Sequence, residues 1–150
     1  MRVPMSVLSN GTEDLPLGLT PAAAYAIVNT AIQKLALMNL HEQVIPFFGL
    51  VRDGAQRGKS AIAMERLVTA VEIRIEGDAP VTSPLIVQLV LGGTLQSQQF
   101  TVAAGATYAL ITVSGGGLVV AANTVVEARI ISGNQASDVV VTLKSQLRVL

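Results

Sequence analysis

The 150-residue sequence contains no cysteine, no tryptophan, two tyrosines and three phenylalanines. Without cysteine the chain forms no disulfides, thiolate nucleophiles or thiolate zinc sites. With so few aromatic residues it also lacks the aromatic girdles expected of a membrane barrel. These absences remove several common classes of catalytic and membrane protein before any motif is considered.

Charge is also scarce, because only 13% of the residues are charged whereas 51% are hydrophobic. A typical soluble domain is about one quarter charged. The longest helical candidate, residues 21–40, carries Asn29, Gln33 and Lys34 and is therefore not expected to span a membrane. We expect no membrane partner, and infer that other protein chains cover part of the surface.

The ten basic and ten acidic residues balance, so the formal net charge is zero. Nucleic-acid-binding domains usually show a basic excess or a basic stripe, and neither is present. We therefore expect no nucleic-acid partner. No cofactor or metal site is predicted either, because His41 is the single histidine and Glu42 is its only near acidic neighbour.

The last eighty residues read as short strands separated by turns rich in glycine, asparagine and proline. Such spacing predicts an antiparallel β-sandwich over residues 68–150, with residues 1–67 forming an N-terminal arm, a helix and a connecting segment. The predicted strands are Val68–Glu76, Leu85–Leu91, Gln96–Val102, Thr107–Val113, Thr124–Ser132 and Asp138–Leu147. The fold class is thus mainly β, with one α-helix.

Residues 1–19 are predicted to form an extended arm. The segment has little periodicity, and its only charged residues are Arg2, Glu13 and Asp14. A free tail is usually more polar, so we expect the arm to lie over a neighbouring subunit and to be ordered by that contact. The side chains expected to make this contact are Val3, Met5, Val7 and Leu8.

Thr20-Pro21 is predicted to begin the helix, because threonine is a good N-cap and proline suits the first helical position. Large apolar side chains then follow at helical spacing: Tyr25, Val28, Ile32, Leu35 and Met38. This stripe fits either a helix packed on its own sheet or a helix at an oligomer interface. His41 is expected to end the helix, where a polar or positive group suits the dipole.

Two further segments bear on assembly and on the edge of the sheet. Leu85–Leu91 is apolar except for Gln88, which predicts a strand covered on both faces and favours a partner chain. Pro46 interrupts Val44–Val51 and predicts an edge strand or an irregular segment.

Ala61–Leu67 is too short for periodicity to distinguish a strand from a helical turn.

The loop Asp53–Ser60 ends in Gly58-Lys59-Ser60 and superficially matches a phosphate-binding loop. The motif requires glycine where Asp53 stands, and an aspartate there would repel phosphates. No βαβ pattern follows it, so a polar surface loop is predicted. No Gly-x-Ser-x-Gly elbow or paired catalytic motif is present, and we expect no enzymatic activity.

Several stretches together resemble small jelly-roll-like β-sandwich modules of tailed-bacteriophage virion proteins. They are residues 102–107 (VAAGAT), 118–127 (LVVAANTVVE), 132–133 (SG) and 137–143 (SDVVVTL). Ala122-Asn123-Thr124 stands where such modules usually have Ala-Gly-Asp, whereas Asp138–Leu143 keeps the final motif. The resemblance covers about half of the chain and none of residues 1–67.

Such modules occur in head decoration, head fibre and tail-tip proteins, so the resemblance implies a virion location, trimers and binding rather than catalysis. The first hypothesis is a capsid decoration or cement protein whose arm contacts the major capsid protein and whose helix holds a homotrimer. The alternative is a receptor-binding or fibre module at the tail or head surface. Fibre proteins usually carry a repetitive shaft, which is missing here.

Overall fold

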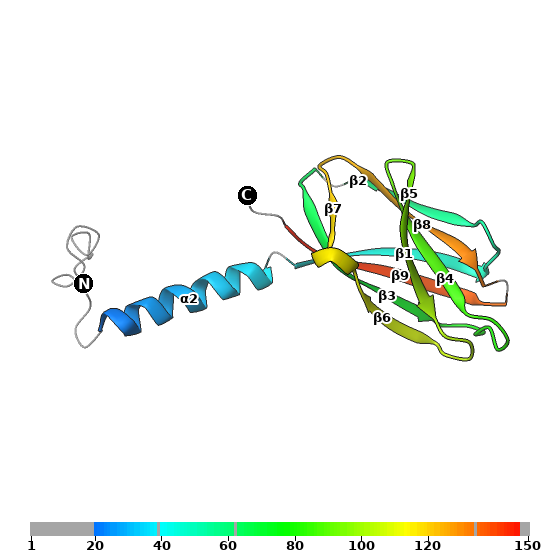
Figure 1. The fold of residues 1–150 in the computed structure, drawn as a ribbon, viewed down its shortest axis with the longest axis horizontal. Coiled ribbons are helices and arrows are strands. Elements are labelled where there is room, and N and C mark those ends of the chain that lie inside the picture. Colours follow the sequence, from blue (N-terminus) through cyan, green and yellow to red (C-terminus); the bar gives the residue numbers. More distant parts are fainter. Residues whose placement is uncertain (1–19, 39, 62, 134, 148–150) are drawn as a thin grey trace. The chain divides into compact units, whose positions relative to one another are not determined.

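The computed structural model describes residues 20–38, 40–61, 63–133 and 135–147. The chain divides into two compact units, residues 1–39 and residues 40–150. The first contains helix α2 and the second contains nine strands, β1 to β9 (Figure 1). No helix among the described residues is both long and apolar enough to cross a membrane.

Helix α2 spans Pro21–Met38 and begins as predicted. The Thr20 hydroxyl oxygen accepts a hydrogen bond from the Ala23 N–H at 3.1 Å, and the Thr20 carbonyl accepts one from the Ala24 N–H at 2.9 Å. The first bond satisfies an N–H group that a helix start leaves without an intrahelical partner, and the second is the first bond of the regular helical ladder. Thr20 is therefore the N-cap.

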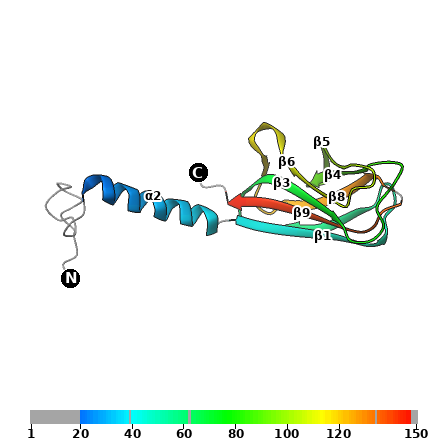
Figure 2. The ribbon, with the colours of Figure 1, turned by 90° about the horizontal axis from the view of Figure 1, so that it is seen from below.

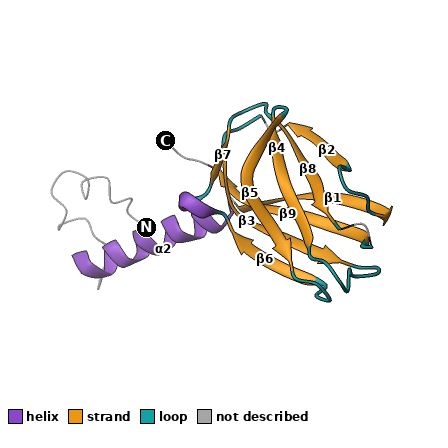
Figure 3. Ribbon diagram, turned by 45° about the vertical axis from the view of Figure 1, so that its right-hand side comes forward, coloured by secondary structure: helices purple, strands orange, loops and turns teal. Residues whose placement is uncertain are grey.

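The second unit is an antiparallel β-sandwich, as predicted (Figure 3). Sheet A has the order β1-β9-β3-β6, and β7 pairs with the other end of β3. Sheet B has the order β2-β8-β4-β5. The strands are β1 Leu40–Leu50, β2 Gln56–Ala61, β3 Arg66–Ile75, β4 Leu85–Leu91, β5 Thr94–Val102, β6 Tyr108–Thr112, β7 Leu118–Val120, β8 Val125–Ser132 and β9 Ser137–Leu147. Figure 2 shows β1, β9 and β3 side by side in one layer.

The strand order is that of a jelly roll when β6 and β7 are counted as one interrupted strand. The chain passes from sheet A to sheet B between β1 and β2, and returns to sheet A at β3. It crosses again to β4 and β5, comes back at β6, and repeats the exchange for β8 and β9. The first and last strands of the sandwich, β1 and β9, thereby become neighbours.

The core lies between the sheets and follows the alternation of the sequence. Val71, Ile73 and Ile75 on β3 are buried, whereas Glu72 and Arg74 between them point to the outer face. Side chains of β1, β4, β8 and β9 complete the apolar interior, including Ile45, Leu85, Leu89, Ile130, Val139 and Val141.

The sandwich begins at Leu40, earlier than the predicted boundary at residue 68. The segment expected to be a connection supplies β1, β2 and the start of β3. Pro46 does lie on an edge strand, as predicted, because β1 pairs only with β9. Sequence patterns missed β2 and β7 because neither shows a run of alternating apolar residues.

Strand β4 has the predicted bounds, but the inference that a partner chain must cover it is wrong. Leu85, Val87 and Leu89 are fully buried, and Gln88 and Val90 are nearly so, within the single chain. The Gln88 side-chain amide donates to the Gln96 carbonyl at 2.9 Å. This strand therefore does not require a partner chain to cover it, and the case for assembly rests on other surfaces.

Candidate interaction surfaces

The predicted apolar stripe of α2 is exposed in the single chain. Tyr25 is 77% exposed, Val28 56% and Ile32 58%. The side chains of Leu35 and Met38, which complete the stripe, lie outside the described residues, as do Val3, Met5, Val7 and Leu8 of the arm. The role of all these residues in assembly stays a prediction.

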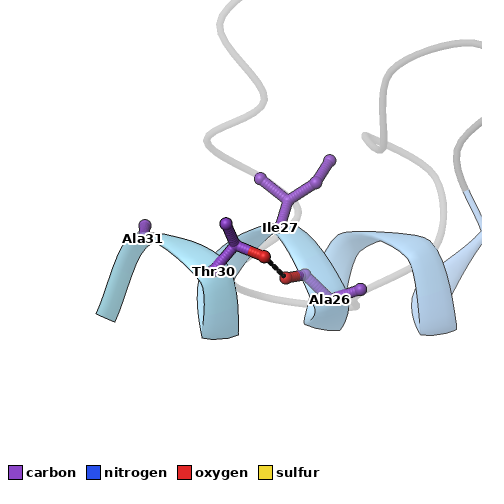
Figure 4. Close-up of a pocket in the computed structure, with 4 residues that line it drawn as sticks. All are labelled: Ala26, Ile27, Thr30 and Ala31. Carbon is purple, nitrogen blue, oxygen red and sulfur yellow. Dashed lines mark hydrogen bonds between the residues drawn. The ribbon is translucent and has the colours of Figure 1, made fainter. Parts of the chain in front are cut away.

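A second face of α2 is also apolar. Ala26, Ile27, Thr30 and Ala31 line a hollow, and Ile27 is 58% exposed (Figure 4). The Thr30 hydroxyl donates to the Ala26 carbonyl at 2.9 Å, so it is satisfied within the helix. No residue from 21 to 33 is charged. Up to Gln33 the helix thus offers apolar, small and uncharged polar side chains, without a charge that would select a charged partner.

The outer face of sheet A has a polar network centred on Glu72. This carboxylate is 14% exposed and accepts a hydrogen bond from the Tyr108 hydroxyl at 3.1 Å. Arg74 lies 3.2 Å from it, and Lys144 lies 3.6 Å from it and 3.2 Å from Glu42. The network joins β1, β9, β3 and β6 across the whole sheet.

The network changes the pKa values of two of its side chains, Tyr108 and Lys144. The hydrogen bond that Tyr108 donates to Glu72 raises the tyrosine pKa above its ordinary value. The hydrogen bond and charge of Glu42, followed by the charge of Glu72, raise the pKa of Lys144. Both shifts favour the protonated side chain in the folded state.

Beside this network lies a groove, lined by Pro46, Phe47, Phe48, Glu76, Asp138 and Val140, with a volume of about 290 Å³. The Phe48 side chain is 85% exposed, whereas Phe47 is buried at 4%. Pairing of Phe47 with Val139 and of Pro46 with Val140 sets the apolar floor. The groove combines an apolar surface with two carboxylates.

The groove residues were not predicted as a site. The signal was present in the pair Phe47-Phe48, because neighbouring residues of a strand point to opposite faces and one of the two must therefore leave the core. Pro46 in the same segment predicted only an edge strand or an irregular segment, and no site. The acidic members, Glu76 and Asp138, meet only through the pairing of β3 with β9.

His41 does not end the helix as expected, because α2 ends at Met38 and His41 lies in β1 opposite Ser145. Burial and the nearby Arg66 charge lower the pKa of His41. Arg66 is only 8% exposed; its Nη1 donates to the Ser145 hydroxyl at 2.9 Å, and its Nε has no hydrogen-bond partner among the residues that the structure describes. This end of sheet A therefore holds a buried cation with few partners.

The segment Asp53–Ser60 contains strand rather than loop alone, since Gln56–Ala61 forms β2 at the edge of sheet B. The Asp53 carboxylate accepts a hydrogen bond from the Gly133 N–H at 3.0 Å, which ties this turn to the one between β8 and β9. The next described element after β2 is strand β3, so the helix that a phosphate loop needs does not follow. Among the described residues, no group of three or more potential metal ligands comes together.

No family model and no curated protein matches this sequence. Among solved structures, the chain is similar to one in the cyanophage Pam1 capsid asymmetric unit, with 19% identity, a TM-score of 0.47, and coverage of 73% of this chain and 84% of that one. It is also similar to the Podospora anserina GH26-CBM35 β-(1,4)-mannanase, with 11% identity, a TM-score of 0.43, and coverage of 74% of this chain and 29% of that one. Similarities of this size assign no activity.

Proposed function

We propose that the chain is a non-enzymatic structural protein of a bacteriophage particle, a decoration or cement protein that binds the head as a homotrimer. The exposed stripe of α2 is the observation that carries this proposal. The sequence resemblance to virion sandwich modules supports it. The likeness to a capsid chain agrees with it and is not an argument for it.

The stripe has the spacing of a helix bundle. Tyr25, Val28, Ile32 and Leu35 are three, four and three residues apart, which is the a/d pattern of a left-handed coiled coil. The three described members are more than half exposed, and burying an apolar side chain of this size contributes about 1.5–3 kcal/mol. Copies of the same helix supply the complementary surface.

We propose a trimer because the resemblance to virion sandwich modules implies trimers. The seam itself does not select this state, because Val28 places a β-branched residue at the first d position whereas Ile32 at a with Leu35 at d is the combination that favours two strands. Ala24 and Ala31 lie beside the seam and allow the helices to approach closely. Most of the stability of a helix in a protein comes from packing of its apolar face, so the bundle would also stabilise α2 itself.

The arm would provide attachment to the shell. Val3, Met5 and Val7 alternate along an extended chain and would present one apolar edge to the major capsid protein, with Leu8 beside them. Burial of these side chains offsets only part of the backbone ordering cost of about 1–2 kcal/mol per residue. The contact would therefore form on the particle and not in the free protein.

The location can be tested on particles that carry a label at the C-terminus of this chain. We expect negative-stain images to show the label on the head shell. A label at the tail tip would favour the receptor-binding alternative, and particles without any label would refute a virion role.

The attachment can be tested with two variants. Deletion of residues 2–19 should leave the β-rich circular dichroism spectrum intact and abolish binding to undecorated particles. A matched Val7→Ser/Leu8→Ser variant keeps the arm's length but loses apolar surface, and should bind more weakly. Unchanged affinity of the deletion variant would show that the arm is not an anchor.

A further inference from the structure

The groove beside Phe48 has the features of a binding surface that the described residues leave unfilled. Phe48 stands 85% exposed next to the half-buried Pro46 and Val140. An aromatic side chain at that exposure leaves most of its apolar area in water, which is unfavourable unless a partner covers it.

The groove is also acidic. One Asp138 carboxylate oxygen accepts a hydrogen bond from the Gly49 N–H at 2.8 Å. Glu76 lies 3.9 Å from Arg74, but Arg74 is closer to Glu72, at 3.2 Å. Arg74 therefore neutralises Glu76 only in part, and the Asp138 contact is with a neutral N–H group. The groove thus suits a basic side chain that has an apolar neighbour.

We propose that this groove binds the tip of the N-terminal arm of a neighbouring copy, with Arg2 placed between Glu76 and Asp138. Arg2 is the only basic residue among residues 1–33, and it stands in an otherwise apolar stretch. The guanidinium would form charge-assisted hydrogen bonds with the carboxylates and a cation–π contact with Phe48.

The arm sequence suits this contact in two ways. The residue before a proline favours an extended conformation, and in an extended segment Arg2 and Pro4 would point to one side and Val3 and Met5 to the other. Arg2 and Pro4 would face the groove, which leaves Val3 and Met5 for the shell. The residues between Arg2 and α2 can extend over roughly 60 Å, enough to cross a neighbouring subunit.

This inference requires copies of the chain side by side, but not any particular particle. The test is a charge-reversal cycle on the full chain, read as the dissociation constant for self-association by sedimentation equilibrium. Arg2→Glu and Glu76→Lys should each weaken association about tenfold. The double variant, which restores opposite charges, should return to within about threefold of the wild type.

Arg129, on the exposed face of sheet B, provides the matched control. Arg129→Glu should leave association unchanged and should not rescue Glu76→Lys. The inference is overturned if neither single variant weakens association, or if the double variant stays as weak as the singles. A rescue seen in unfolding stability but not in self-association would assign the groove to the chain's own arm and would likewise overturn it.

Discussion

The side chain of Gln98 joins β5 to the turn that contains Ser114, and so closes one edge of the sandwich. Its carbonyl oxygen accepts hydrogen bonds from the Ser114 N–H at 2.9 Å and from the Ser114 hydroxyl at 3.0 Å. Its amide donates to the Thr112 carbonyl at 3.1 Å. Strands β5 and β6 belong to different sheets, so this one side chain bridges the two sheet edges.

Gln98→Ala should destabilise the sandwich by about 1–3 kcal/mol, because each lost hydrogen bond contributes roughly 0.5–1.5 kcal/mol. Urea unfolding followed by circular dichroism measures the change. Gln99→Ala is the matched control, since this exposed neighbour points away from the bridge, and it should change stability by less than about 0.5 kcal/mol. Equal effects of the two substitutions would show that the bridge contributes nothing.

Alkaline pH should weaken the fold through Tyr108. Its raised pKa means that the folded chain holds this proton more tightly than the unfolded chain. The resulting stabilisation is complete below the ordinary tyrosine pKa of about 10 and is lost as the pH rises through the raised value. The stability difference between wild type and Tyr108→Phe should therefore shrink above about pH 10 in thermal unfolding. A difference that stays constant at high pH would contradict the Glu72 contact.

Arg66 is predicted to cost stability in the free chain. Its burial lowers its pKa, and its Nε lacks a partner within the described part of the chain. Arg66→Met should leave the free energy of unfolding unchanged or raise it by about 1–2 kcal/mol. Removing the charge should also raise the lowered pKa of His41, measured by NMR titration. A loss of stability or an unmoved His41 titration would mean that Arg66 has a compensating partner.

Much of the sandwich could be predicted because local patterns and core packing agree. The alternation of Val71, Ile73 and Ile75 fixes the buried face of β3. Gly92-Gly93, with φ of +54° and +85°, makes the two-residue turn between β4 and β5. Strand β2, with the polar sequence QRGKSA, has no such pattern and is a strand because it pairs with β8.

The candidate interaction surfaces differ in how far they could be predicted, because one is local in sequence and the other is not. The stripe of α2 is local in sequence, and Tyr25, Val28 and Ile32 could be listed from their spacing alone. The groove combines Phe48 of β1, Asp138 of β9 and Glu76, which directly follows β3, and their proximity depends on the register between these three strands. The sequence alone does not give that register, so the groove could be identified only from the structure.

Self-association through α2 is central to the proposed function, and sedimentation equilibrium of the full chain tests it directly. We predict a trimer for the wild type and a monomer for Val28→Asp/Ile32→Asp, with the β-rich circular dichroism spectrum retained. Gln33→Glu, which adds one negative charge at a heptad position away from the seam, should stay trimeric. A wild-type chain that sediments as a monomer at micromolar concentration, or a double variant that remains trimeric, would contradict the account.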